Sequence, residues 1–173
     1  MKFIVAIDGT AASGKGTLAK QTANHFGFKY LDTGILYRVV AYNLKSSDIR
    51  SKISKYKIQD SLKLLFNKNF QLSDLRNEEI SLKASIISKN KLVRANLLSY
   101  QREFALQDGG AVLDGRDIGT VVCPNADVKI FVDADIEIRA KRRHNQYLKN
   151  NSKLNLNDII EDLTKRDNLD KTR

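Results

Sequence analysis

Apolar and polar residues follow two different periods along this chain. Short, nearly continuous apolar runs between glycine or polar residues predict strands at 3–7, 28–32, 111–115 and 127–134. Elsewhere apolar residues recur every three or four positions, which predicts amphipathic helices at about 15–26, 33–45, 91–107, 135–150 and 156–173. Strands that alternate with helices favour an α/β fold with a central parallel sheet.

Local signals indicate where several of these elements begin and end. Gly27 follows the first helix and is expected to stop it, and Asp108-Gly109-Gly110 ends the helix at 91–107. Thr33 precedes the apolar positions of the second helix and is expected to cap it. The runs at 111–115 and 127–134 are rich in apolar residues, so both are expected to be buried strands.

The size of the chain is that of one domain. It has 173 residues, of which 42% are hydrophobic, so we expect a single domain at 1–173 with one main core. The apolar start ends at Asp8 and is too short for a signal segment, and no later run approaches membrane-spanning length. We therefore expect a cytoplasmic protein with no membrane partner. Cys123 is the only cysteine, which excludes an internal disulfide.

The net charge of +10 does not by itself identify one class of binding partner. Basic residues are concentrated at 45–102, where 13 Lys and Arg face 5 Asp and Glu. Such an excess is compatible with nucleic acid, an acidic membrane surface, phosphorylated small molecules or an ordinary solvated surface. No basic stretch is interleaved with aromatic residues, as a single-strand binder would require, so we expect no nucleic-acid partner.

The stretch "DGTAASGKGT" (8–17) lies between the first predicted strand and the first predicted helix. It matches the Gly-x-x-x-x-Gly-Lys pattern of a phosphate-binding loop. Gly9 and Gly14 allow successive N–H groups to point at phosphate oxygens, the helix adds its positive N-terminal end, and Lys15 can reach the terminal phosphates. The alternative is a glycine-rich turn with an exposed lysine.

One position departs from that pattern. Gly16 stands where the loop usually has a Ser or Thr that ligates Mg²⁺, and the hydroxyl follows one residue later on Thr17. We therefore expect phosphates and water to hold Mg²⁺, with no direct protein ligand, and Thr17 to bond the α-phosphate. The sequence "GKGT" resembles nucleoside monophosphate kinases more than GTPases or motor ATPases.

Two further stretches place charged residues after predicted strands. In "LDTGILYR" (31–38), Arg38 offers a planar fork for a phosphate and Tyr37 a stacking surface. In "LDGRDIGTVV" (113–122), Arg116 would neutralise a phosphate and Asp117 could accept a hydrogen bond from the exocyclic amine of a base. The alternatives are a capped helix with a surface arginine and a purely structural Asp–Arg turn.

The motifs of this chain resemble, in order and approximate spacing, those of the bacterial cytidylate kinases, which are P-loop nucleoside monophosphate kinases. The resemblance covers nearly all of the chain and rests on "DGTAASGKGT", "LDTGILYR", "AS" (84–85), "VR" (93–94), "DGRDIGTVVCPNADVKIFVDA", "RAKRR" and "RDNLDKTR". It implies a three-layer α/β/α fold around a parallel sheet, ATP as phosphoryl donor with Mg²⁺, CMP or dCMP as acceptor, and a role in pyrimidine metabolism. A monomer is the default expectation.

The resemblance also implies roles for individual residues. The ATP phosphates would be bound by Gly9, Thr10, Ala11, Ala12, Ser13, Gly14, Lys15, Gly16 and Thr17. CMP would be bound by Thr33, Tyr37, Arg38, Ser85, Arg94, Arg116, Asp117, Arg166, Asp170 and Arg173. Within that set, Ser85, Arg94, Asp117 and Arg173 would form the base pocket, and Thr33, Arg166 and Asp170 would hold the sugar. Residues around the transferring phosphoryl would be Lys15, Arg38, Arg116, Arg142, Arg143 and Arg166; the alternative for Arg142 and Arg143 is a solvated basic helix face.

Three departures from the family accompany these assignments. Thr33 stands where the family usually has serine. The acceptor-side insert, placed at 46–83 between core segments 1–45 and 84–173, is short; lysines and serines interrupt its apolar pattern, so we expect short helices and a loop without the family's small antiparallel sheet. A lid is expected at about 142–160, with the polar "NSK" as its turn, and the family's C-terminal strand and helix are not found in these 173 residues. Another small-molecule P-loop kinase, or a nucleotide- or RNA-binding module without turnover, remains the alternative function.

Overall fold

The computed structural model describes residues 2–44, 53–67, 70–75, 77–148 and 155–171. The chain separates into two compact units, Met1–Leu31 with Ala105–Arg173, and Asp32–Phe104. Among the described residues, every helix is too short or too polar to traverse a bilayer.

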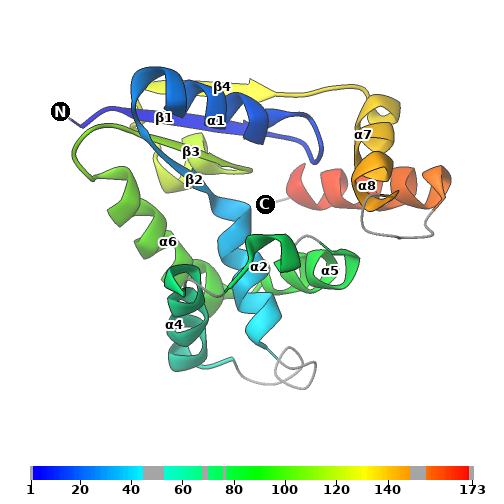
Figure 1. Cartoon of the computed structure of the whole chain (residues 1–173), viewed down its shortest axis with the longest axis horizontal. Coiled ribbons are helices and arrows are strands. Elements are labelled where there is room, and N and C mark those ends of the chain that lie inside the picture. The colour runs from blue at the N-terminus through cyan, green and yellow to red at the C-terminus, as the bar shows by residue number, and fades with distance from the viewer. Residues whose placement is uncertain (1, 45–52, 68–69, 76, 149–154, 172–173) are drawn as a thin grey trace. The chain divides into compact units, whose positions relative to one another are not determined.

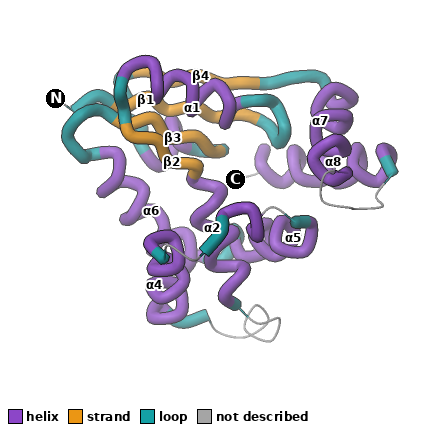
Figure 2. The backbone as a smooth tube through the Cα atoms, in the orientation of Figure 1, coloured by secondary structure: helices purple, strands orange, loops and turns teal. Residues whose placement is uncertain are grey.

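A four-stranded parallel sheet forms the centre of the first unit. Its strands are β1 (Ile4–Gly9), β2 (Lys29–Asp32), β3 (Ala111–Gly115) and β4 (Val128–Val132), in the order β2-β3-β1-β4 (Figure 2). Asp8 of β1 lies opposite Gly115 of β3, and Gly9 lies opposite Val132 of β4. The carboxyl ends of these three strands therefore meet at one edge of the sheet, where open α/β sheets bind their ligands. The α/β fold with a parallel sheet and flanking helices is confirmed.

The helix α1 (Lys15–Phe26) packs on this sheet (Figure 1). Ala19 and Ala23 on its inner face are buried against Val5 and Ile7 of β1. Gly27 ends the helix in the left-handed region, with φ 67, as its position in the sequence predicts. Small inner residues bring α1 close to β1, so the loop that joins them is short and held at both ends.

The prediction that both late strands are buried is right for β3 and wrong for β4. All five residues of β3 are buried, because this strand lies between β2 and β1. By contrast, β4 is the last strand in the sheet order, and Val128, Ile130 and Phe131 are exposed, Phe131 by 68%. An apolar run has the same sequence pattern in a central strand and in an edge strand, so the pattern could not distinguish them.

Two helices follow β4 in the same unit. They are α7 (Ile136–Leu148) and α8 (Leu156–Lys171), which pack against each other. Their shared apolar cluster joins Ala140 of α7 to Ile159 and Leu163 of α8, and it includes Ala11 of the loop before α1. The loop is therefore packed on both helices. The predicted turn "NSK" between them lies outside the described residues.

Apart from Asp32, the last residue of β2, the described residues of the second unit form helices and the turns between them. Its elements are α2 (Thr33–Asn43), α4 (Lys55–Lys63), the short helical turns Leu64–Phe66 and Leu72–Leu75, α5 (Glu78–Ile87) and α6 (Lys91–Ala105). No strand occurs within 53–67, 70–75 or 77–83, in line with the expectation of short helices in the insert. The cap of α2 is corrected: Thr33 is the first helical residue and Asp32 is the N-cap, whose side chain makes no capping hydrogen bond.

Candidate functional site

The loop between β1 and α1 has a backbone that few side chains allow. Gly9 has φ 156, and a Cβ there would lie 2.0 Å from the carbonyl oxygen of Val132. Gly14, the N-cap of α1, has φ 99. Ala12 has φ 60, the left-handed region that non-glycine residues rarely adopt. Positive φ angles of this kind give a loop the sharply curved form in which backbone N–H groups can converge on an anion.

Lys15 begins α1 directly after this curve. Its Nζ lies 3.4 Å from the carbonyl oxygen of Thr10, so the side chain folds back over the loop. Gly14 has no side chain with which to cap α1, and no acidic residue stands in the first turn. A phosphate is a suitable partner for the N–H groups and the positive end of such a helix.

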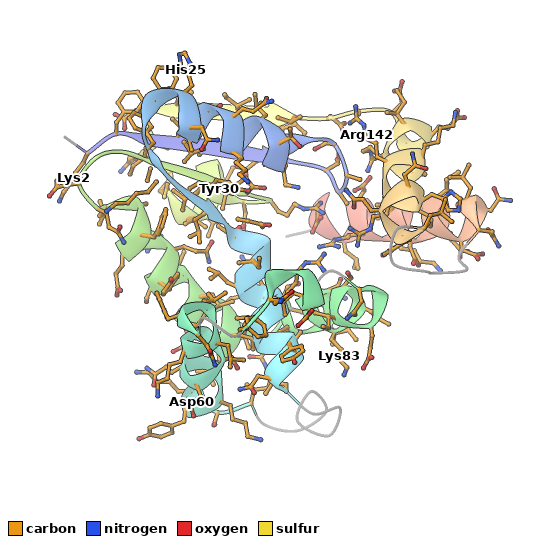
Figure 3. All side chains as sticks on the ribbon, viewed as in Figure 1. Lys2, His25, Tyr30, Asp60, Lys83 and Arg142 are labelled. Carbon is orange, nitrogen blue, oxygen red and sulfur yellow. The ribbon has the colours of Figure 1, made fainter. Side chains whose placement is uncertain are left out.

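Gly16 faces an acidic group across the loop. A Cβ on Gly16 would lie 3.6 Å from Asp114 Oδ2 and 3.6 Å from the Tyr30 hydroxyl, which itself donates to Asp114 Oδ1 at 2.8 Å (Figure 3 labels Tyr30). Asp114 is only 4% exposed. A carboxylate beside a phosphate-binding loop is a hard oxygen group of the kind that Mg²⁺ prefers, directly or through water. The residues present fit a cation held mainly by phosphates and water.

Asp8 ties the end of β1 to the turn after β3. Its two carboxylate oxygens accept hydrogen bonds from the N–H groups of Ile118 at 2.7 Å and Gly119 at 2.8 Å. Burial raises the pKa of Asp8, and the two N–H bonds oppose that rise; Asp117 raises the pKa further and Lys15 lowers it. Sequence reasoning did not assign Asp8 a role. Its signal was a carboxylate at the end of a buried strand, immediately before Gly9.

The turn after β3 carries two of the predicted acceptor residues. Arg116 forms an ion pair with Asp170 of α8, and the side chain of each is 16% exposed. Arg116 and Asp170, both predicted to bind CMP, are thus brought together. Asp117 and Arg166 are half-buried in the same unit.

The arginines of α7 contact the phosphate-binding loop and their own helix. Arg142 donates to the carbonyl oxygen of Ser13 at 2.8 Å (Figure 3 labels Arg142). Arg143 lies over the ring of Tyr147, with its guanidinium carbon 4.7 Å from the ring centroid. Arg139, which sequence reasoning missed, is 6% exposed and pairs with Asp167 of α8. The only signal for Arg139 in the sequence was its place in "RAKRR", the motif in which Arg142 and Arg143 were assigned to the transferring phosphoryl.

The remaining predicted acceptor residues belong to the second unit. Thr33 is buried and Tyr37 half-buried on α2, while Ser85 lies on α5 and Arg94 on α6. Arg38 donates at 2.9 Å to the carbonyl oxygen of Leu75 and at 2.9 Å to the Ser81 hydroxyl. The contacts of these residues with an acceptor stay predictions, and Arg173 lies outside the described residues.

The described part of the chain contains no cluster of three His, Cys, Asp or Glu side chains that could hold a metal ion by themselves.

Comparison with known proteins gives one consistent result. A family model described as cytidylate kinase matches residues 5–173. The cytidylate kinase of Bartonella tribocorum is 45% identical over 171 residues, which cover 99% of this chain and 79% of the relative. Those of Bradyrhizobium diazoefficiens and Rhodopseudomonas palustris are 46% and 44% identical over 173 residues, covering 99% of this chain and 80% of each relative.

A solved structure, described as the crystal structure of TT1252 from Thermus thermophilus, resembles this chain more weakly. It has a TM-score of 0.44 and 17% identity, and the match covers 90% of this chain and 82% of the other. The family model and the relatives, which span nearly the whole chain, are sufficient without it. This chain belongs to the cytidylate kinase family.

Proposed function

We propose that this protein transfers the γ-phosphoryl group of ATP to CMP and dCMP, forming CDP and dCDP. The observation that carries the proposal lies at one edge of the sheet. There the hydrogen bonds of Asp8 join the strand that leads into the phosphate-binding loop to the turn that contains Arg116 and Asp117. A phosphoryl transferase needs its donor and acceptor phosphates next to each other, and this arrangement provides for both. The cytidylate kinase relatives support CMP as the acceptor.

On the donor side, the N–H groups of Gly9–Thr17 and the amino group of Lys15 bind the phosphates of ATP. Phosphoryl transfer requires little covalent chemistry from a protein, so these groups act by alignment and by neutralising charge. Mg²⁺ bound to the phosphates would supply additional positive charge to the β and γ oxygens. Asp114, next to Gly16, is the residue placed to orient such an ion or its water.

On the acceptor side, Arg38 and Arg116 bind the phosphate of CMP. Cytosine presents an amino group that donates and a ring nitrogen and carbonyl oxygen that accept. A carboxylate on Asp117, a hydroxyl on Ser85 and the guanidinium of Arg94 together match this mixed pattern. Thr33, Arg166 and Asp170 bind the sugar, and Arg142, Arg143 and Arg166 surround the transferring group.

A coupled assay of ADP release, run with ATP, Mg²⁺ and each of CMP, dCMP, UMP and AMP, tests the proposal. We expect turnover with CMP and dCMP and much slower turnover with UMP and AMP. A different preferred acceptor would indicate another small-molecule kinase of the same fold. Binding of ATP without turnover on any acceptor would indicate a nucleotide-binding module, and either result would overturn the proposal.

A further inference from the structure

Two carbonyl groups of the phosphate-binding loop accept hydrogen bonds from arginines on α7. Arg139 Nη1 lies 3.4 Å from the carbonyl oxygen of Ala11, and Arg142 Nη1 lies 2.8 Å from that of Ser13. The two arginines are three positions apart and share one face of the helix. Ala11 also packs in the apolar cluster between α7 and α8, so this wall of the loop is fixed by packing as well as by hydrogen bonds.

These contacts determine where the N–H groups of the loop point. In a planar trans peptide, the carbonyl and the following N–H point in opposite directions. A carbonyl of Ala11 directed at Arg139 therefore turns the N–H of Ala12 away from α7, and a carbonyl of Ser13 directed at Arg142 does the same for Gly14. Ala12, between these two peptides, has φ 60, a strained conformation that persists only when its surroundings impose it.

Arg139 is held by two further contacts. Its Nε donates to the carbonyl oxygen of Ala134 at 2.7 Å, and its Nη2 lies 2.7 Å from Asp167 Oδ2. The side chains of Arg139 and Asp167 are 7% and 12% exposed, so the pair is largely removed from water. The other oxygen, Asp167 Oδ1, is buried and has no hydrogen-bond partner among the described residues. The ion pair with Arg139 is therefore the main polar interaction of the Asp167 carboxylate among the described residues.

We propose that Arg139 and Asp167 are positioning residues for the phosphate-binding loop. Asp167, on α8, holds the guanidinium of Arg139 in the orientation that binds the Ala11 carbonyl, and this contact turns the N–H of Ala12 toward the bound phosphate. The pair also links the donor loop to α8, which carries Arg166 and Asp170 on either side of Asp167. This inference rests on the proposed function only in requiring that the loop binds a phosphate chain.

Inorganic tripolyphosphate tests the inference, because it has the phosphates of ATP without the base and sugar. Its affinity is measured by calorimetry for the wild type, Asp167→Asn and Arg139→Lys. If only long-range charge mattered, removing the negative charge of Asp167 would tighten the binding of an anion, because the repulsion between the two is lost. If Asp167 positions Arg139, we expect Asp167→Asn to weaken the binding about tenfold, because an N–H contact to a charged phosphate is lost. Arg139→Lys keeps the charge without the planar fork and should also weaken it.

Glu161→Gln is the matched control on the same helix. Glu161 pairs with Lys165 four residues away, and both side chains are 66% exposed, so this variant removes one negative charge without altering the loop. We expect its affinity to stay at or slightly above that of the wild type. Asp167→Glu, which restores the charge with one extra methylene, should recover part of the affinity lost in Asp167→Asn.

The possible failures are distinct. A wild type that binds neither tripolyphosphate nor ATP would overturn the proposed function together with this inference; if it binds ATP alone, the same variants are compared with ATP. A wild type that binds, with Asp167→Asn and Arg139→Lys binding as tightly as Glu161→Gln, would overturn the positioning role alone. Circular dichroism identifies a temperature at which each variant is folded, and affinities are compared at that temperature. If Asp167→Asn does not fold, the affinities of Arg139→Lys and Asp167→Glu, each compared with that of Glu161→Gln, test the positioning role.

Discussion

Arg116 and Asp170 form an ion pair, although 54 positions separate them in the sequence. Arg116 lies in the turn after β3 and Asp170 near the end of α8, and both are proposed to bind CMP. Each charged group is thus satisfied by the other before an acceptor arrives. The proposed binding of CMP would exchange this contact for contacts with the phosphate and the sugar.

Asp170→Asn is expected to lower the free energy of unfolding by about 1.5–3 kcal/mol, the value of a hydrogen bond to a charged group. With CMP bound, the loss should be smaller, because Asp170 then accepts a hydrogen bond from a sugar hydroxyl, which the amide oxygen of asparagine can also accept, while Arg116 pairs with the acceptor phosphate. Urea unfolding with and without CMP measures both quantities. Glu161→Gln on the same helix is the control, with unchanged stability. A loss in Asp170→Asn that is the same with and without CMP would contradict the proposed exchange.

The buried carboxyl of Asp8 predicts a pH dependence of stability. Its pKa is raised above the ordinary value of 3.8, mainly by burial, so the folded state binds this proton more tightly than the unfolded state. The stability that Asp8 contributes is therefore fully present below pH 3.8 and is lost as the pH rises through the raised pKa. Urea unfolding of the wild type and Asp8→Asn from pH 3 to 7 measures it. The wild type should lose stability relative to Asp8→Asn as the pH rises; a constant difference would refute the assignment.

Lys15→Ala is expected to lower kcat for CMP phosphorylation by about 10³-fold, because the charge that develops on the transferring group loses a neutralising partner. Its Nζ lies 3.4 Å from the carbonyl oxygen of Thr10, near the outer limit of a hydrogen bond, so the melting temperature should change little. The ADP-release assay and thermal unfolding measure the two effects. Turnover close to that of the wild type would end the assignment of Lys15 to the donor phosphates.

Asp117→Ala is expected to reduce the preference for CMP over UMP. Its carboxylate is proposed to accept from the amino group of cytosine, which uracil lacks, and loss of such a contact is worth about tenfold in discrimination. The ratio of kcat/KM for CMP to that for UMP measures the change. An unchanged ratio with a uniformly lower rate would show that Asp117 acts only through the turn that Asp8 holds.

Gly9 and Gly27 predict different costs for the same substitution. Gly27→Ala is strained by its φ of 67 but meets no atom within 4 Å, so it should cost about 1–2 kcal/mol. Gly9→Ala would place its Cβ 2.0 Å from the Val132 carbonyl and force β1 and β4 apart, at a cost of at least about 3 kcal/mol. Chemical denaturation compares the two variants; similar stabilities would contradict the close approach of β4 to Gly9.

The parts of this fold that were predictable carry strong local signals. Lys15–Phe26 and Ala111–Gly115 have the predicted ends, because a glycine closes the first and the apolar residues that follow Gly110 begin the second. The cap of α2 was misplaced by one residue, since a hydroxyl at the start of a helix favours either the cap or the first turn. The motif residues of the loop could likewise be named from their spacing alone.

The supporting residues of the site could not be predicted, because their roles arise from pairings between distant segments. Asp8 binds the turn after β3 only because the strands align Asp8 with Gly115. Arg139 and Asp167 meet because α7 and α8 pack together, and nothing in their spacing shows which of several arginines faces inward. Single-sequence patterns report on neighbours along the chain, whereas these contacts depend on the topology.

The exposed edge of the sheet has a practical consequence for work on this protein. An apolar strand that offers free backbone groups on its outer side is a template for a strand from another molecule. A lysine at such a position normally discourages this, but the amine of Lys129 is directed at the carbonyl oxygen of Pro124, close to its own strand. A charged residue in place of Phe131, which is 68% exposed, should therefore raise the solubility of concentrated samples, because it removes an exposed apolar ring from β4.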